Sequence, residues 1–205
     1  MGLKKWKLRL LIAIIVVIAG AFTTGKVNGS IPETWDGLVT AVTGEKQKDQ
    51  DISIEVPKHA VRVTLDHAVD GDTVAVKLES GQVTTVRLLL IDTPESVKRG
   101  VAVQPFAIEA SDRMKQIVNA ADQLYLEYDV GDRTDRYDRT LAYLYADGKN
   151  VNEMMVREGF ARVAYVYPPN TKYLNQLKAA EKQAKHAKKN IWSKVGYVTD
   201  RGFGK

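Results

Sequence analysis

Two polar segments interrupt the apolar pattern in the middle of the chain, each beside a segment with the pattern of a β-strand. They are residues 70–73 (DGDT) and residues 87–95 (RLLLIDTPE). Neighbouring strands can bring such segments together. Carboxylates gathered at one point repel one another unless a cation lies among them, and an arginine beside them suits a phosphate. The fold must therefore bring these strand ends to one polar site, where metal and phosphate chemistry is possible.

The strand pattern is regular from residue 59 onward. Hydrophobic residues make up 44% of the 205 residues and charged residues 27%, which suits a globular domain. The strands are expected at residues 61–66, 73–79, 82–91, 123–130 and 140–146. Helices are expected at 105–119, from Asn150 to Gly159, and at 174–189. Five short strands with about three interspersed helices predict an α+β fold built on a five-stranded OB-fold barrel.

The N-terminus is basic and then apolar from residue 10 to residue 22. Thirteen helical residues span roughly 20 Å, short of the ~30 Å of a bilayer core. This pattern favours a signal peptide cleaved after Ala21, and the alternative is an uncleaved anchor with membrane contact through residues 8–25. Both predict a secreted or cell-surface protein.

The expected organisation has four parts. They are a signal or anchor (1–22), a spacer (23–58), the barrel domain (59–195) and a loose tail (196–205).

A metal site in this chain has to be built from oxygen ligands. The sequence has no cysteine and three histidines, which favours calcium or magnesium. Asp72 and Asp92 are the candidate ligands, and Thr93 can add its backbone carbonyl. Glu95 lies three residues after Asp92, where it can act as a general base or hold a water molecule. The alternative is that residues 70–72 only form a turn.

Two arginines and three tyrosines complete the candidate site. Arg87 interrupts an apolar strand, which is costly unless the charge is paired or directed into a site. Arg139 precedes the strand at 140–146 and is a candidate for binding charge on a phosphorus; a surface position is the alternative. Tyr165 and Tyr167 share one side if their segment is extended. With Tyr137 they can stack on bases or pack in the core.

From Val69 to Trp192 the chain resembles the staphylococcal nuclease (thermonuclease) family. The resemblance is carried by several segments in the family's order. They are residues 70–74, 87–95, 133–135, 141–143, 146–149, 151–153, 163–167 and 190–192. It implies an OB-fold barrel and calcium-dependent hydrolysis of DNA and RNA. It also implies attack by water, release of the 5′-oxygen and 3′-phosphate ends.

The resemblance also implies a role for each matching residue. Those for the metal are Asp72, Asp92 and the Thr93 carbonyl, with Asp70 as a nearby supporting carboxylate. The catalytic residues are Arg87, Arg139 and the water-activating Glu95. The nucleotide contacts are Tyr137, Tyr165 and Tyr167.

Three positions depart from the family pattern. Asp138 stands where the best-known members have Gly, Arg136 replaces a lysine, and Ile108 interrupts the pairing usual after the aromatic residue at 106.

The sequence thus predicts an exported, calcium-dependent, sugar-non-specific nuclease acting on DNA and RNA, with single-stranded or frayed substrates preferred. A monomer is expected. One alternative is a non-catalytic OB domain that binds single-stranded nucleic acid. That alternative predicts the loss of a catalytic residue, whereas all of them are present. A second alternative is a surface scaffold in which the anchor and spacer carry the function.

Overall fold

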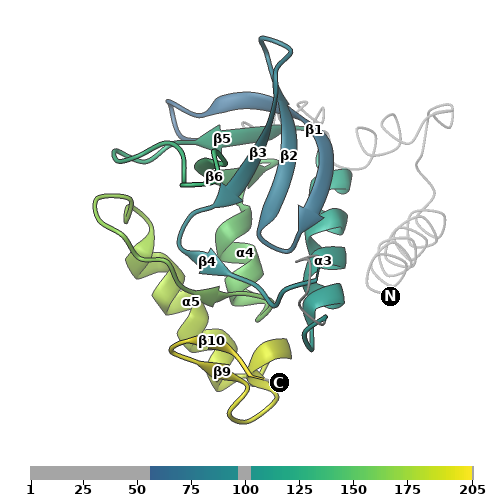
Figure 1. Ribbon diagram of the computed structural model, residues 1–205, viewed down its shortest axis with the longest axis vertical. Helices are drawn as coiled ribbons and strands as arrows, with labels where there is room; N and C mark the ends of the chain where they lie inside the picture. The colour runs from purple at the N-terminus through teal and green to yellow at the C-terminus, as the bar shows by residue number, and fades with distance from the viewer. Residues whose placement is uncertain (1–55, 97–102, 205) are drawn as a thin grey trace, which may run out of the picture. The chain divides into compact units, whose positions relative to one another are not determined.

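The computed structural model describes residues 56–96 and 103–204, which form a closed β-barrel with three helices (Figure 1). The barrel strands are β1 (Val61–Asp70), β2 (Thr73–Leu78), β3 (Val83–Leu88), β5 (Leu124–Glu127) and β6 (Thr140–Ala146). They pair in the order β3-β2-β1-β5-β6, and a parallel β3–β6 pairing closes the barrel. The predicted α+β OB-type fold is confirmed.

The helices are α3 (Ala107–Ala120), α4 (Val151–Arg157) and α5 (Leu174–His186). The start predicted at Asn150 is present, because its side chain accepts a hydrogen bond from Glu153 N at 3.0 Å. The helix ends just before Gly159, whose φ of 77° suits glycine. Helix α4 packs against both β6 and α5, so it links the barrel to the C-terminal part of the domain.

The core fills the barrel and the space beneath the helices. Its strand residues include Val74, Leu88, Leu126 and Leu144, each at most 1% exposed. Helices α3, α4 and α5 add Met114, Met155 and Leu177, which are fully buried. Each such side chain contributes about 1.5–3 kcal/mol on burial, which gives the polar site a rigid support.

The strand expected at 82–91 is split, so that prediction was wrong in its extent. β3 ends at Leu88, and the next strand, β4 (Ile91–Asp92), pairs with β8 (Arg162–Val163) instead. Leu90 has a φ of 65°, which turns the chain between the two strands. The fully buried Asn152 side chain accepts from Leu144 N at 3.1 Å and donates to Leu89 O at 2.8 Å, which holds this turn against β6.

The loose tail expected at 196–205 was also wrong for the described residues 196–204. β9 (Val198–Thr199) and β10 (Gly202–Phe203) form an antiparallel hairpin. Tyr197 is 2% exposed and its ring contacts that of Phe203, with centroids 5.6 Å apart. The apolar residues of this segment are therefore packed rather than solvated.

The remaining elements are β7 (Lys149–Asn150) and a 3₁₀ helix, η1 (Asn190–Trp192). No helix in the described ranges is long and apolar enough to span a bilayer. The predicted signal or anchor at 1–22 and most of the spacer lie outside those ranges.

Replacing Asn152 by alanine should destabilise the domain. The change leaves Leu89 O and Leu144 N without their side-chain partner in a fully buried site, which should cost about 2–4 kcal/mol. Urea unfolding measures this cost. Asn119→Ala, at an exposed position on α3, is the matched control and should change stability by less than about 0.5 kcal/mol. Equal effects of the two changes would contradict the role given to Asn152.

Candidate active site

Three strand pairings place the charged residues of the site. In the β2–β3 pair, Thr73 lies opposite Arg87, so the guanidinium-bearing residue is next to Asp72. In the β4–β8 pair, Asp92 lies opposite Arg162. The parallel β3–β6 pairing begins at Thr140, so the residue before it, Arg139, enters the same region. The barrel strands and the separate β4–β8 pair therefore bring together residues from four segments of the sequence.

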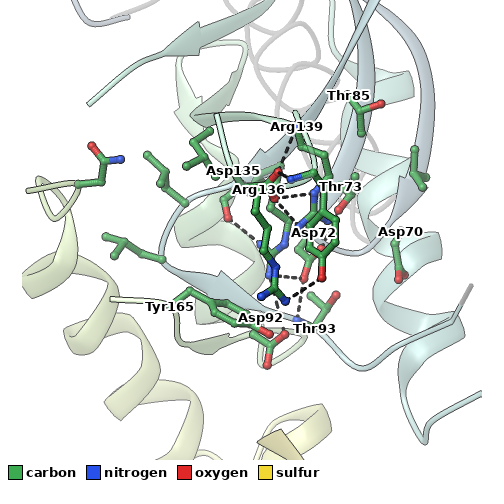
Figure 2. A pocket seen from close by; sticks show the side chains of 18 of the residues that line it. Asp70, Asp72, Thr73, Thr85, Asp92, Thr93, Asp135, Arg136, Arg139 and Tyr165 are labelled. Atoms are coloured by element: carbon green, nitrogen blue, oxygen red, sulfur yellow. Dashed lines mark hydrogen bonds and ion pairs between the residues drawn. The ribbon is translucent and has the colours of Figure 1, made fainter. Parts of the chain in front are cut away.

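Asp72, Arg87, Asp92 and Arg139 line one pocket of about 800 Å³, a volume typical of ligand sites. Every predicted site residue is in its lining: Asp70, Asp72, Arg87, Asp92, Thr93, Glu95, Tyr137, Arg139, Tyr165 and Tyr167. Figure 2 shows Asp72, Asp92, Thr93 and Tyr165 near one another, with Asp135 and Arg139 above them in that view.

Arg87 joins the two candidate metal ligands. Its Nη2 lies 3.1 Å from Asp72 Oδ2 and 3.9 Å from Asp92 Oδ1, and its Nη1 donates to Leu88 O at 2.7 Å. The Arg87 and Asp72 side chains are each 11% exposed. Burial, together with the charge of Asp72, raises the pKa of Asp92 above its usual value, although Arg162 and Arg87 oppose that shift. Both carboxylates thus lie near the Arg87 guanidinium and are largely shielded from solvent, and its charge partly balances theirs.

The floor of the pocket offers oxygen ligands to a cation. Asp72 Oδ2 accepts from Thr93 N at 3.1 Å, which sets Thr93 beside both carboxylates. Thr93 Oγ1 is buried and has no hydrogen-bond partner among the described residues. Within the same residues no group of three or more His, Cys, Asp or Glu side chains is arranged for a metal. Two carboxylates and Thr93 therefore fit a hard cation that completes its coordination with water.

Gly71 allows the close approach of β2 to this floor. A Cβ at position 71 would lie 2.9 Å from Thr93 Oγ1 and 3.0 Å from the Ala110 Cβ. Such a contact would displace Thr93, so the glycine between the two aspartates is required by packing.

Glu95 is held through its backbone from two directions. Its N–H donates to Gln104 Oε1 at 2.7 Å, and its carbonyl accepts from Gln104 N at 3.1 Å. Asp70 accepts from the Ser96 hydroxyl at 2.7 Å and from Gly71 N at 2.7 Å. Burial raises the pKa of Asp70, against the hydrogen bonds from Ser96 and Gly71. Asp70 thus supports the segment that carries Glu95.

Arg139 is oriented by Asp135, to which the sequence analysis gave no role. Asp135 Oδ2 accepts from Arg139 Nε at 2.8 Å and lies 2.6 Å from its Nη2. Burial would raise the pKa of Asp135, but hydrogen bonds from Arg139 and from the backbone of Tyr137 hold it below its usual value. Asp135 is therefore ionised at neutral pH and fixes one edge of the guanidinium. The spacing of four from Asp135 to Arg139 was the available signal.

Three tyrosines line the pocket, and two of them contact its arginines. Arg87 lies over the Tyr165 ring, 5.2 Å from its centroid, and Arg139 lies 5.4 Å from the Tyr137 centroid. Tyr165 has a φ of 53°, so the segment that carries Tyr165 and Tyr167 is not extended, and an extended backbone does not give the two rings a shared side. Tyr137, Tyr165 and Tyr167 are 63%, 55% and 69% exposed, which leaves ring faces open to a ligand.

Arg162 was missed by the sequence analysis. Its Nε donates to Asp92 Oδ2 at 2.9 Å, and its side chain is 13% exposed. Asp92 thus has one guanidinium on each side. No local pattern pointed to this residue, because its partner lies 70 positions earlier in the chain.

A family model described as staphylococcal nuclease homologue matches residues 85–194. The chain belongs to this family. It is 59% identical over 146 residues to the SPbeta prophage-derived endonuclease YokF of Bacillus subtilis (strain 168), covering 71% of this chain and 49% of that protein. Endonuclease YncB of the same organism is 56% identical over 146 residues, covering 71% and 68%. The thermonuclease of Staphylococcus hyicus is 43% identical over 125 residues, covering 61% and 72%. The chain thus spans about half of the first of these relatives.

The structure explains one departure from the pattern of the staphylococcal nuclease family. Asp138 has a φ of 59°, a conformation that glycine adopts freely and that aspartate tolerates better than most residues. Its N–H donates to Asp135 O at 3.0 Å in a tight turn, and its side chain is exposed. Asp138 therefore maintains the turn from which Arg139 enters the pocket.

Ile108, another departure from the family pattern, is 51% exposed on α3 and does not line the pocket.

Substitutions at Asp138 should report this backbone conformation. Asp138→Gly should be at least as stable as the wild type. Asp138→Ala should be about 1–2 kcal/mol less stable than the glycine variant, because the left-handed conformation penalises a Cβ. Thermal unfolding of the three proteins measures the difference. Equal stability of the alanine and glycine variants would contradict the left-handed conformation.

Proposed function

We propose that this chain is a calcium-dependent nuclease that hydrolyses phosphodiester bonds of DNA and RNA. The observation that carries the proposal is one pocket that holds two guanidiniums, two paired carboxylates and Glu95. Relatives named endonuclease and thermonuclease support the same reaction class.

The proposed reaction is attack by water on phosphorus. The water oxygen forms the new bond to phosphorus and gives a proton to Glu95. The bond to the 5′-oxygen breaks, and that oxygen takes up a proton from solvent, which gives a 3′-phosphate and a 5′-hydroxyl end. Arg87 and Arg139 bind the negative charge that grows on the phosphoryl oxygens, where preorganised donors are worth several kcal/mol. Their positions are fixed in advance by Asp72 and Asp135.

Calcium is the cation we propose for Asp72, Asp92 and the Thr93 carbonyl. When bound, it would neutralise phosphate charge and orient the attacking water. The all-oxygen set and the few carboxylates fit a cation that retains water molecules. Asp72 and Asp92 would contribute two negative charges, which Arg87 and Arg162 balance in the protein alone.

Exposed tyrosine rings support recognition without sequence preference. Tyr137, Tyr165 and Tyr167 can stack on bases, which is worth roughly 1–3 kcal/mol per base and is tolerant of sequence. Bases are available for stacking where strands are single or frayed, so such substrates are proposed to be preferred. A single chain is the proposed active unit, since one chain supplies every predicted site residue of the pocket.

A non-catalytic nucleic-acid-binding barrel is the alternative function. It would need neither Glu95 nor the carboxylate pair, yet these lie in one pocket with both arginines. This arrangement favours hydrolysis. Export to the cell surface or medium remains our proposal from the basic and apolar N-terminal sequence.

Loss of Arg139 should abolish most of the activity while leaving the fold intact. Arg139→Ala should lower kcat on single-stranded DNA by about 100-fold or more, because a charge-stabilising donor is lost. Arg157→Ala, on α4 and outside the pocket lining, removes an equal charge and should leave kcat within about twofold. Near wild-type activity of Arg139→Ala would refute the role assigned to this residue.

Calcium and Glu95 should both be needed for cleavage. We expect the full chain to cut single-stranded DNA with calcium and to stop when chelator is in excess. Glu95→Gln should reduce kcat by about 100-fold or more while retaining DNA binding, since general base catalysis is lost. Electrophoresis of the products and a binding titration separate the two effects. Binding without cleavage under every condition would favour the alternative function.

A further inference from the structure

The C-terminal hairpin lies beyond the matched family segment, which ends at residue 194. It is closed by the β9–β10 pairing and by Gly204 N, which donates to Tyr197 O at 2.7 Å. Figure 1 shows it at the end of the barrel domain opposite the β2–β3 turn. Its aromatic residues, Tyr197 and Phe203, pack on the domain instead of facing solvent. The hairpin contacts two segments that lead to the carboxylates of the pocket.

One side of the hairpin contacts Arg162. The guanidinium lies over the Phe203 ring, 5.6 Å from its centroid, and Nη1 donates to Thr199 O at 3.5 Å. The same guanidinium donates through Nε to Asp92 Oδ2 at 2.9 Å. The hairpin therefore holds the Arg162 guanidinium in place, and the guanidinium in turn holds the Asp92 carboxylate.

The other side of the hairpin contacts the segment before α3. Tyr197 donates its hydroxyl to Pro105 O at 2.5 Å, and its ring lies 5.6 Å from that of Phe106. Burial, with the charge of Glu109, raises the pKa of Tyr197 to about 12, so the phenol stays protonated and able to donate. The residue before Pro105 is Gln104, which holds both backbone groups of Glu95.

We propose that residues 197–204 form a brace that positions Asp92 and Glu95, with Arg162 and Tyr197 as the positioning residues. The proposal deepens the proposed function and rests on it for the meaning of the two carboxylates. Catalysis depends on geometry so steeply that displacing a reacting group by about 1 Å can cost as much as 100-fold. In the part of the chain that the structure describes, Arg87, Arg139 and Tyr137 make no hydrogen bond, ion pair or ring contact with the brace, so loosening it should spare phosphate binding.

Phe203→Ala is the main test, because it removes the ring that packs on both Arg162 and Tyr197. We expect kcat on single-stranded DNA with calcium to fall roughly 10- to 100-fold, with KM within about twofold. Amide hydrogen exchange of the metal-free protein should rise in residues 90–96 and 104–107. Val195→Ala, at a position 99% exposed in the same terminal segment, is the matched control and should change neither quantity.

Tyr197→Phe and Arg162→Lys refine the test without removing the packing. Tyr197→Phe removes only the hydroxyl that bonds to Pro105 O, so exchange should rise at 104–107 and less at 90–96. Arg162→Lys keeps the charge near Asp92, so it should restore part of the kcat that Arg162→Ala loses. If Phe203→Ala does not fold, the exchange and kcat of Tyr197→Phe and Arg162→Lys test whether residues 197–204 position Asp92 and Glu95.

Three results would overturn the brace. They are unchanged exchange in residues 90–96 and 104–107, increased exchange confined to 196–204, and a loss of kcat that only follows the unfolded fraction measured by thermal unfolding. If the wild type fails to cleave DNA with calcium, the proposed function is wrong. The exchange measurements then decide on the brace alone, with increased exchange in both segments supporting it and no change refuting it.

Discussion

The buried ion pairs of Arg87 organise this domain. A guanidinium 11% exposed would be strongly destabilising without partners, since a buried charge loses its hydration. Asp72 and Asp92 supply the partners, but only when β2, β3 and β4 lie as they do. The charge pairing therefore selects one arrangement of the strand ends. The strand ends that form the pocket are held in the protein alone by these opposite charges.

Opposite charges also balance one another around Asp92. Asp72 and Asp92 face Arg87 on one side, and Arg162 binds the outer oxygen of Asp92 on the other. Two carboxylates and two guanidiniums are neutral together, so the pocket avoids the repulsion of an unmatched acidic pair. On the proposed function, a cation at Asp72 and Asp92 would compete with both guanidiniums, which would limit its affinity. A bound phosphate would favour the exchange of Arg87 for the cation, because it would give Arg87 a new partner.

The sequence predicted the barrel, and it named ten residues that the structure brings into one pocket, because their signals are local. Alternation marks the strands, and residues 70–73 and 87–95 carry the acids and Arg87 within short segments. Arg162 could not be found this way, because its partnership with Asp92 exists only through the β4–β8 pairing. The C-terminal hairpin was missed for a similar reason. Its strands of two residues are too short for a periodic pattern, and packing of Tyr197 stabilises it.

Three of the seven non-glycine residues with positive φ in the described ranges lie in or beside the pocket, and two of them explain errors of prediction. Leu90, Tyr165 and Asp138 have φ of 65°, 53° and 59°, although none is glycine. Each costs about 1–2 kcal/mol in that conformation, so the surrounding contacts must fix it. Leu90 is 1% exposed, which anchors the turn into β4. The three turns redirect the chain where Asp92, the Tyr165 ring and Arg139 enter the site. Part of the backbone strain of the domain thus lies where side chains enter the pocket, as is common at functional sites.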